Sequence, residues 1–146
     1  MAGFVALATN NDVYIGTFKN GEVNGVENGQ FVTVNHATGV ATLADVAKGD
    51  KEVYFVSNEI DTIPEQGIDD TDYKVKKDTY LRLNAPLAGT VYVTTKFNGT
   101  LNVGDKVAVG VGGNVEAIGA RTPKVAFVVK EKTTEFGKDA VRLLTL

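Results

Sequence analysis

Turn-forming dipeptides interrupt this chain so often that only short segments remain between them. Asn-Gly occurs four times, at 20–21, 24–25, 28–29 and 98–99. Both residues tolerate positive φ, and the pair is typical of the tight turns that join hairpin strands. The segments between turns are mostly five to ten residues long and rich in Val, Thr, Tyr and Phe, which favour strands. The chain is therefore expected to build sheets.

Apolar and polar residues alternate along several of these segments, as in strands with one buried face. The alternating segments span 73–83, 89–97, 105–111, 124–130 and 139–145. The run 53–56 is continuously apolar and predicts a strand buried on both faces. The best helical candidate is about one turn at 43–48, ended by Gly49. We predict an all-β sandwich or barrel of about ten short, mostly antiparallel strands.

An acidic segment divides the chain. Residues 59–72 carry six Asp and Glu side chains and no Lys or Arg, and they include Pro64 and Gly67. We predict an exposed connecting loop at 59–72 between an N-terminal β-unit at 1–58 and a C-terminal β-unit at 73–146. The sequence leaves open whether these are two small β-subdomains or one barrel with a long loop.

The composition leaves few groups that could do chemistry. Cys and Trp are absent, and His36 and Ser57 are the only residues of their types. Disulfides and thiolate metal sites are thereby excluded, and the net charge of −3 argues against a nucleic-acid partner bound through bulk charge. No apolar run reaches the length of about 18 residues that indicates a membrane-spanning helix. The first ten residues lack Lys and Arg, so we expect no export by the general secretory route.

Ser57 and His36 form the only Ser–His pair available for nucleophilic catalysis. Ser57 lacks the Gly-x-Ser-x-Gly context of a nucleophile elbow, and His36 is most simply a turn residue. Candidate carboxylates for an unrecognised hydrolase lie on no catalytic motif; they are Asp69, Asp70, Asp72 and Glu116. We predict that the chain is not an enzyme.

Three clusters have both a binding and a structural interpretation, and the structural one is favoured in each. Residues 69–72 lack the ligand spacing of a calcium loop. The glycines of 110–113 precede a β-pattern, which favours a hairpin over a phosphate-binding loop. The lysines of 74–77 have Tyr80 as their one aromatic neighbour, so a solvated strand face is favoured over nucleic-acid binding. We predict no metal and no cofactor.

The chain is small, acidic and free of Cys, and it is rich in Gly and Thr along most of its length. Its segments 102–109, 113–118 and 123–129 look like the β-hairpins of phage virion proteins. In this composition and in these segments, the chain resembles the decoration or cement proteins of tailed bacteriophage heads. The resemblance implies a virion structural protein, made in the cytoplasm of the bacterial host, that binds the major capsid protein lattice on the capsid exterior. It also implies a homo-oligomer, a trimer being one expected form, that stabilises the mature shell through repeated contacts.

The N-terminal arm at 2–9 is a predicted contact segment because it is uncharged and largely apolar. Such an arm can add a strand to the sheet edge of a neighbour. The alternative is an ordinary first strand inside its own sheet. Its candidate contact residues are Ala2, Gly3, Phe4 and Val5.

The C-terminus is a second predicted contact segment. Leu144 and Leu146 fall opposite Val141 and Leu143, so both faces of the last strand are apolar. This indicates either deep burial or docking on a partner. The acidic segment 59–72 is a third candidate, since it could meet a basic capsid patch.

Two other binding roles stay open. One is a tail or baseplate β-module of a virion. The other is a carbohydrate-binding β-sandwich, in which Tyr14, Tyr54, Tyr80 or Tyr92 would stack on sugar rings.

Overall fold

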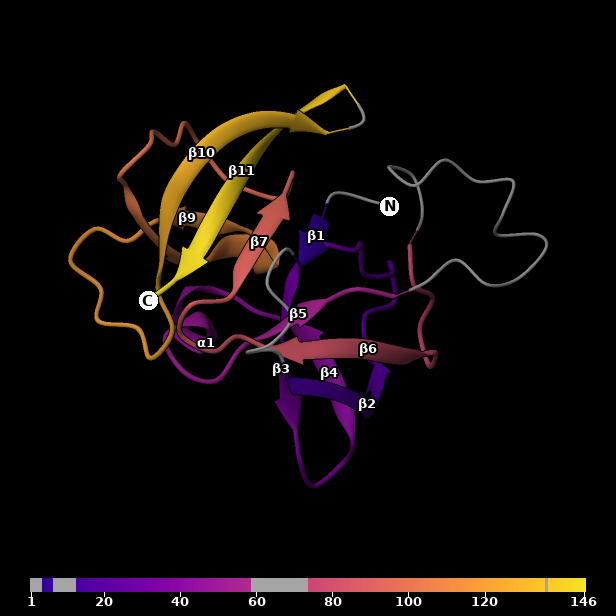
Figure 1. Cartoon of the computed structure of the whole chain (residues 1–146). Coiled ribbons are helices and arrows are strands. Elements are labelled where there is room, and N and C mark those ends of the chain that lie inside the picture. The colour runs from indigo at the N-terminus through magenta and orange to yellow at the C-terminus, as the bar shows by residue number, and fades with distance from the viewer. Residues whose placement is uncertain (1–3, 7–12, 59–73, 136) are drawn as a thin grey trace.

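Two sheets make up the computed structural model, which describes residues 4–6, 13–58, 74–135 and 137–146 (Figure 1). The strands of one sheet are β1 (Phe4–Ala6), β7 (Val91–Thr94), β8 (Lys106–Val109), β9 (Val115–Ala117), β10 (Phe127–Glu135) and β11 (Lys138–Thr145). The strands of the other are β2 (Val13–Asn20), β3 (Phe31–Asn35), β4 (Val40–Leu43), β5 (Tyr54–Val56) and β6 (Tyr80–Ala85). The predicted all-β fold is confirmed.

The first sheet is open and six-stranded, in the order β1-β7-β11-β10-β8-β9, whereas the second closes into a small barrel, β2-β4-β3-β5-β6. Among the described strands, β2 and β4 run parallel and the other pairs are antiparallel. The long β10–β11 hairpin contains a register shift between Val129 and Glu131. Such a shift increases local twist, and the hairpin curves over the rest of its sheet (Figure 1).

The alternation read from the sequence matches burial in β6, where Leu81 and Leu83 are buried and Tyr80 and Arg82 are exposed. It is less accurate at 105–111. There β8 ends at Val109, and Val111 lies 62% exposed in a short 3-10 helix, Val111–Gly113. Gly112 and Gly113 have φ of 70° and 74°. These left-handed conformations suit glycine and turn the chain from β8 into β9, so the predicted hairpin is confirmed.

The single predicted helical turn is also present, although shorter than expected. Helix α1 spans Val46–Gly49, and the Asp45 side chain caps it by accepting a hydrogen bond from the Lys48 backbone N–H at 2.8 Å. An Asp at this position satisfies a backbone donor that the helix itself leaves unpaired. Leu43 belongs to β4 instead.

No helix within the described part of the chain has the length and apolar character that a membrane crossing requires.

One hydrophobic cluster, here called the shared core, joins the two sheets. The barrel side contributes Phe31, Ala44, Val53 and Phe55, and the six-stranded side contributes Tyr92, Leu101, Val107, Val109, Val115, Phe127, Val129, Val141 and Leu143. Four rings lie at its centre: the Phe31 centroid is 5.2 Å from that of Phe55 and 5.4 Å from that of Phe127, and Phe55 lies 4.4 Å from Tyr92. Ring contacts of this kind add to the burial of their apolar area.

The continuously apolar run at 53–56 is buried on both sides, as predicted. Val53 and Phe55 pack into the shared core, whereas Tyr54 and Val56 pack into the barrel interior. Successive side chains of a strand point to opposite faces. The part of the barrel wall that faces the other sheet therefore needs apolar residues at every position.

The predicted boundary at 59–72 does not separate the two sheets. Strand β1, from the N-terminal unit, pairs with β7 in the six-stranded sheet. Strand β6, from the C-terminal unit, pairs with β2 and β5 and so closes the barrel. Each sheet therefore combines strands from both sides of the acidic segment, which itself lies outside the described residues.

Close backbone approaches also join the two sheets. The Gly113 N–H donates to the Ala44 carbonyl oxygen at 2.8 Å, and a Cβ at Gly113 would collide with the Phe31 carbonyl oxygen. The buried Thr94 hydroxyl donates to the Gly29 carbonyl oxygen at 3.0 Å. These contacts hold the 3-10 turn and β7 directly against the barrel.

Candidate interaction surface

The structure gives Ser57 and His36 separate partners. Ser57 is buried, and its hydroxyl oxygen accepts a hydrogen bond from the Asn84 side-chain amide at 3.3 Å. His36 is exposed; its Nε2 lies 3.3 Å from a Glu52 carboxylate oxygen, and its ring packs edge-on against Phe18. In a nucleophile and base pair, the hydroxyl would hydrogen-bond to the imidazole ring. Ser57 and His36 instead contact Asn84 and Glu52.

Glu116 has a structural role. One of its carboxylate oxygens accepts from the Val111 backbone N–H at 2.9 Å and from the Asn98 side-chain amide at 3.2 Å. The other candidate carboxylates, Asp69, Asp70 and Asp72, lie outside the described residues. Within the part of the chain that is described, no three His, Asp or Glu side chains are grouped so as to hold a metal ion.

The tyrosines expected to stack on sugars are placed differently from one another. Tyr92 is fully buried in the shared core and Tyr54 is 7% exposed in the barrel interior, so neither can reach a ligand at the surface. Tyr80 is 57% exposed, and the Lys19 ammonium lies 5.3 Å from its ring centroid. The Tyr14 side chain is not among those described. The carbohydrate hypothesis thus loses two of its four aromatic platforms.

Part of the predicted N-terminal contact segment forms a strand of the chain's own sheet. Strand β1 is the edge strand next to β7, with Phe4 opposite Thr94 and Val5 opposite Val93. This is the placement that the alternative interpretation describes. Ala2 and Gly3 lie outside the described residues, as do 7–9, and contact with a partner through this arm stays a prediction.

The predicted C-terminal contact residues lie on the side of the six-stranded sheet that faces away from the barrel. Val141 and Leu143 are buried in the shared core, whereas Leu144 is half-buried and Leu146 is 54% exposed. Leu144 is directly opposite Val91 on β7 and Val128 on β10, both half-buried. Side chains opposite one another on adjacent strands share a face. We call Val91, Val128, Leu144 and Leu146 the outer face.

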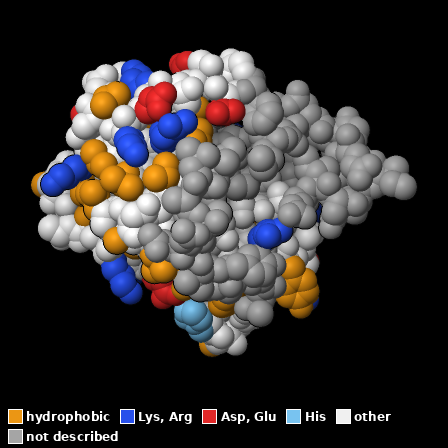
Figure 2. All heavy atoms as spheres, viewed as in Figure 1, with side chains coloured by type: hydrophobic (Ala, Val, Ile, Leu, Met, Phe, Trp, Pro, Cys, Tyr) orange, Lys and Arg blue, Asp and Glu red, His pale blue; other side chains and the backbone are white. Residues whose placement is uncertain are grey.

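Charged groups border the outer face. Next along β11, Arg142 forms an ion pair with Glu131 at 3.0 Å, while Lys130 is exposed on β10. Figure 2 shows hydrophobic side chains gathered where β7, β10 and β11 lie, with Lys and Arg side chains around them. Leu87, 43% exposed in the turn before β7, adds a further apolar side chain at the surface. An apolar centre with a charged rim is the usual composition of a protein interface.

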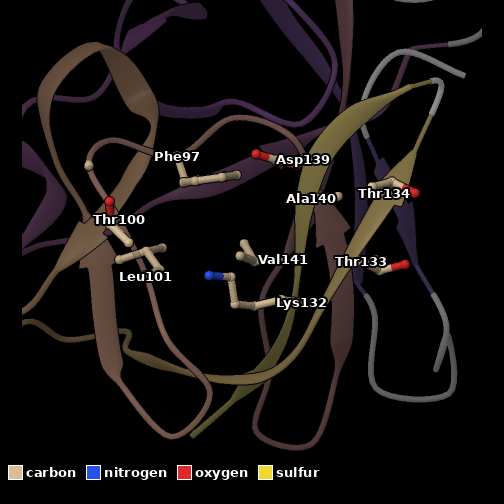
Figure 3. A pocket seen from close by; sticks show the side chains of 10 residues that line it. Phe97, Thr100, Leu101, Lys132, Thr133, Thr134, Asp139, Ala140 and Val141 are labelled. Carbon is tan, nitrogen blue, oxygen red and sulfur yellow. The ribbon is translucent and has the colours of Figure 1, made fainter.

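A hollow of about 450 Å³ lies under the curved β10–β11 hairpin. Its apolar floor includes Leu101 and Val141, and Thr100, Lys132 and Asp139 stand at its rim. Figure 3 shows the Lys132 side chain reaching into the space between the hairpin and the segment that holds Phe97 and Leu101. One ammonium and one carboxylate over an apolar floor define no catalytic pair and no particular ligand.

Sequence reasoning missed Val91 and Val128 as part of the outer face. Both lie in segments that are predicted to alternate, but no local pattern indicates which face of such a strand another element covers. The signal that could have found them is strand pairing, because each lies opposite Leu144.

No protein-family model matches this chain, and no curated protein matches it either.

Proposed function

We propose that this chain is a non-enzymatic structural protein of a tailed-phage virion, which decorates the capsid exterior by binding the major capsid protein. The observation that carries the proposal is the outer face, where half-buried and exposed aliphatic side chains from three strands adjoin a rim of charged groups. The chain resembles decoration proteins in its composition and in its strand segments, and this resemblance supplies the identity of the partner.

The shared core makes the outer face suitable for docking. Strands β7, β10 and β11 bury their opposite face against the barrel, and the aromatic cluster lies directly beneath them. A surface fixed in this way loses little side-chain and backbone freedom on binding, which lowers the entropic cost of association. One such face is small, so binding depends on repetition across a symmetric lattice.

The test uses mature capsids that lack the protein, mixed with the purified full chain and recovered by sedimentation. Saturable binding at a fixed ratio to the capsid subunit is expected. The variant Leu146→Asp, which places a charge within the predicted contact, should weaken binding by about tenfold or more.

Val23→Asp is the matched control, because Val23 is 78% exposed in a turn of the barrel side and should bind as the parent does. Absence of saturable binding would overturn the proposal. Assembly of the isolated protein into rings or tubes in negative stain would point to a tail component instead.

A further inference from the structure

All four Asn-Gly pairs of this chain have a sequence that is prone to spontaneous deamidation, and they differ in how the fold protects them. In an Asn-Gly pair, the glycine backbone nitrogen can attack the asparagine side-chain carbonyl carbon, since glycine has no side chain to hinder the approach. The reaction requires the side-chain amide to rotate freely and the glycine N–H to be released. Hydrogen bonds to either group oppose it.

Asn20 and Asn28 are held at both reacting groups. Asn20 is fully buried; its amide nitrogen donates to the Val75 carbonyl oxygen at 2.7 Å and its amide oxygen accepts from the Glu22 N–H at 2.8 Å. The Gly21 N–H donates to the Ala41 carbonyl oxygen at 2.8 Å, a bond between separate barrel segments.

Asn28 is 1% exposed and exchanges two hydrogen bonds with the Asn58 backbone, at 2.7 and 2.8 Å. The Gly29 N–H donates to the Val56 carbonyl oxygen at 3.0 Å. Attack at Asn20 or Asn28 therefore requires the barrel to open.

Asn98 is held through its side chain. The amide nitrogen donates to the Val111 carbonyl oxygen at 3.0 Å and to a Glu116 carboxylate oxygen at 3.2 Å, and the amide oxygen accepts from Asn114 at 3.1 Å. The side chain is fixed against the 3-10 turn, although Gly99 is exposed.

Asn24 lacks these restraints. It is exposed, and no hydrogen bond joins its side chain to another described residue. The Gly25 N–H donates to the Glu22 carbonyl oxygen, at 3.1 Å within the same four-residue turn, and to no other residue that the structure describes. Opening that one turn frees the nucleophile without disturbing either sheet.

We propose that Asn24–Gly25 is the site at which this protein deamidates spontaneously, and that its other three Asn-Gly pairs are protected by the fold. The Gly25 nitrogen bonds to the Asn24 side-chain carbonyl carbon, the bond from that carbon to Nδ2 breaks, and ammonia leaves with the Gly25 proton. A five-membered succinimide results. Water then adds to one of its two carbonyl carbons and opens the ring to aspartate or isoaspartate.

Each event adds one negative charge at residue 24, next to Gly25, and the Lys74 side chain lies close to Gly25. Isoaspartate also lengthens the backbone of the turn by one carbon. Neither change reaches the shared core or the outer face, so the modified protein stays folded and accumulates with age as a more acidic species.

The test follows the four sites in the folded full-length chain, incubated at mildly alkaline pH and digested for peptide mass spectrometry with fragmentation that separates aspartate from isoaspartate. Two hydrogen bonds of ordinary net strength slow a site by roughly ten- to a hundredfold. Asn24 is therefore expected to react at least about tenfold faster than each of the other three. The same measurement in denaturant should bring all four rates within one order of magnitude of each other.

Two variants sharpen the test. Asn24→Gln should abolish the fast acidic species, because the larger ring it would form closes slowly. Asn114→Ala removes the donor to Asn98 Oδ1 and should raise the Asn98 rate by about fivefold while leaving Asn24 unchanged. Equal rates at Asn24 and Asn98 in the folded parent, or a fast site at Asn20 or Asn28, would overturn the proposal.

Discussion

The two faces of β11 carry similar residues in opposite surroundings. Val141 and Leu143 are at most 1% exposed because the barrel packs against them, whereas Leu144 is half-buried and Leu146 is 54% exposed. Aliphatic side chains on both faces of a strand therefore do not determine its burial. The burial of each face depends on whether another element covers it, and in the described part of the chain the barrel covers only one face of β11.

The two faces are also expected to differ in what they contribute, one to the stability of the fold and the other to binding. Residues of the inner face hold two sheets together and should govern unfolding, while residues of the outer face cost little when changed in the isolated protein. Four experiments with five substitutions test this division, in order of decreasing expected effect on stability.

Phe127→Ala should have the largest effect. Phe127 is fully buried, and its ring packs against Phe31 across the contact between the sheets. Loss of a buried ring leaves a cavity and costs about 3–5 kcal/mol, measured as the free energy of unfolding in urea. Tyr80→Ala is the control, since Tyr80 is 57% exposed and should change stability by about 1 kcal/mol or less. Similar losses for both would contradict a shared core.

Leu143→Ala and Leu144→Ala compare the two faces at adjacent positions. Leu143 is fully buried, so truncation should cost about 2–5 kcal/mol. Leu144 is half-buried and should cost about 1 kcal/mol. Urea unfolding of both variants gives the difference, and a larger loss at Leu144 would show that the outer face is covered in the isolated protein.

Much of the fold could be predicted because its signals are local. The alternation in β6, the doubly buried run at 53–56 and the single turn of helix each depend on a few neighbouring residues. Sheet membership could not be predicted, since β1 and β6 join sheets on the far side of the acidic segment through pairings distant in sequence.

The candidate site shows the same limit. Leu144 and Leu146 could be singled out from alternation alone, but their actual exposure depends on the barrel lying on the other face. Tyr92 illustrates the opposite error. Its segment, 89–97, is predicted to alternate between a buried and a polar face, and the buried face includes Tyr92, which enters the aromatic centre of the shared core.

Thr145→Val should have a smaller and opposite effect. Thr145 continues the inner face and is 3% exposed. Its hydroxyl has no hydrogen-bond partner among the described residues, and neither has the Thr90 hydroxyl on the neighbouring segment. Valine has nearly the same shape without the desolvated hydroxyl, so stability should rise by about 1 kcal/mol. The thermal midpoint measures the gain, with Thr79→Val, at an exposed position, as the control. A loss of stability would mean that the Thr145 hydroxyl is hydrogen-bonded in solution.

Leu146→Asp should change the stability of the isolated chain least. The Leu146 backbone N–H donates to the Ala126 carbonyl oxygen at 3.0 Å, a bond that the substitution leaves in place, and its side chain is 54% exposed. Unfolding in urea should therefore shift by no more than about 0.5 kcal/mol. If capsid binding falls while stability is retained, the outer face acts in recognition, because a purely structural role would move both measurements together. A stability loss as large as that of Leu143→Ala would instead place Leu146 in the packing of its own chain and remove the comparison on which the binding proposal depends.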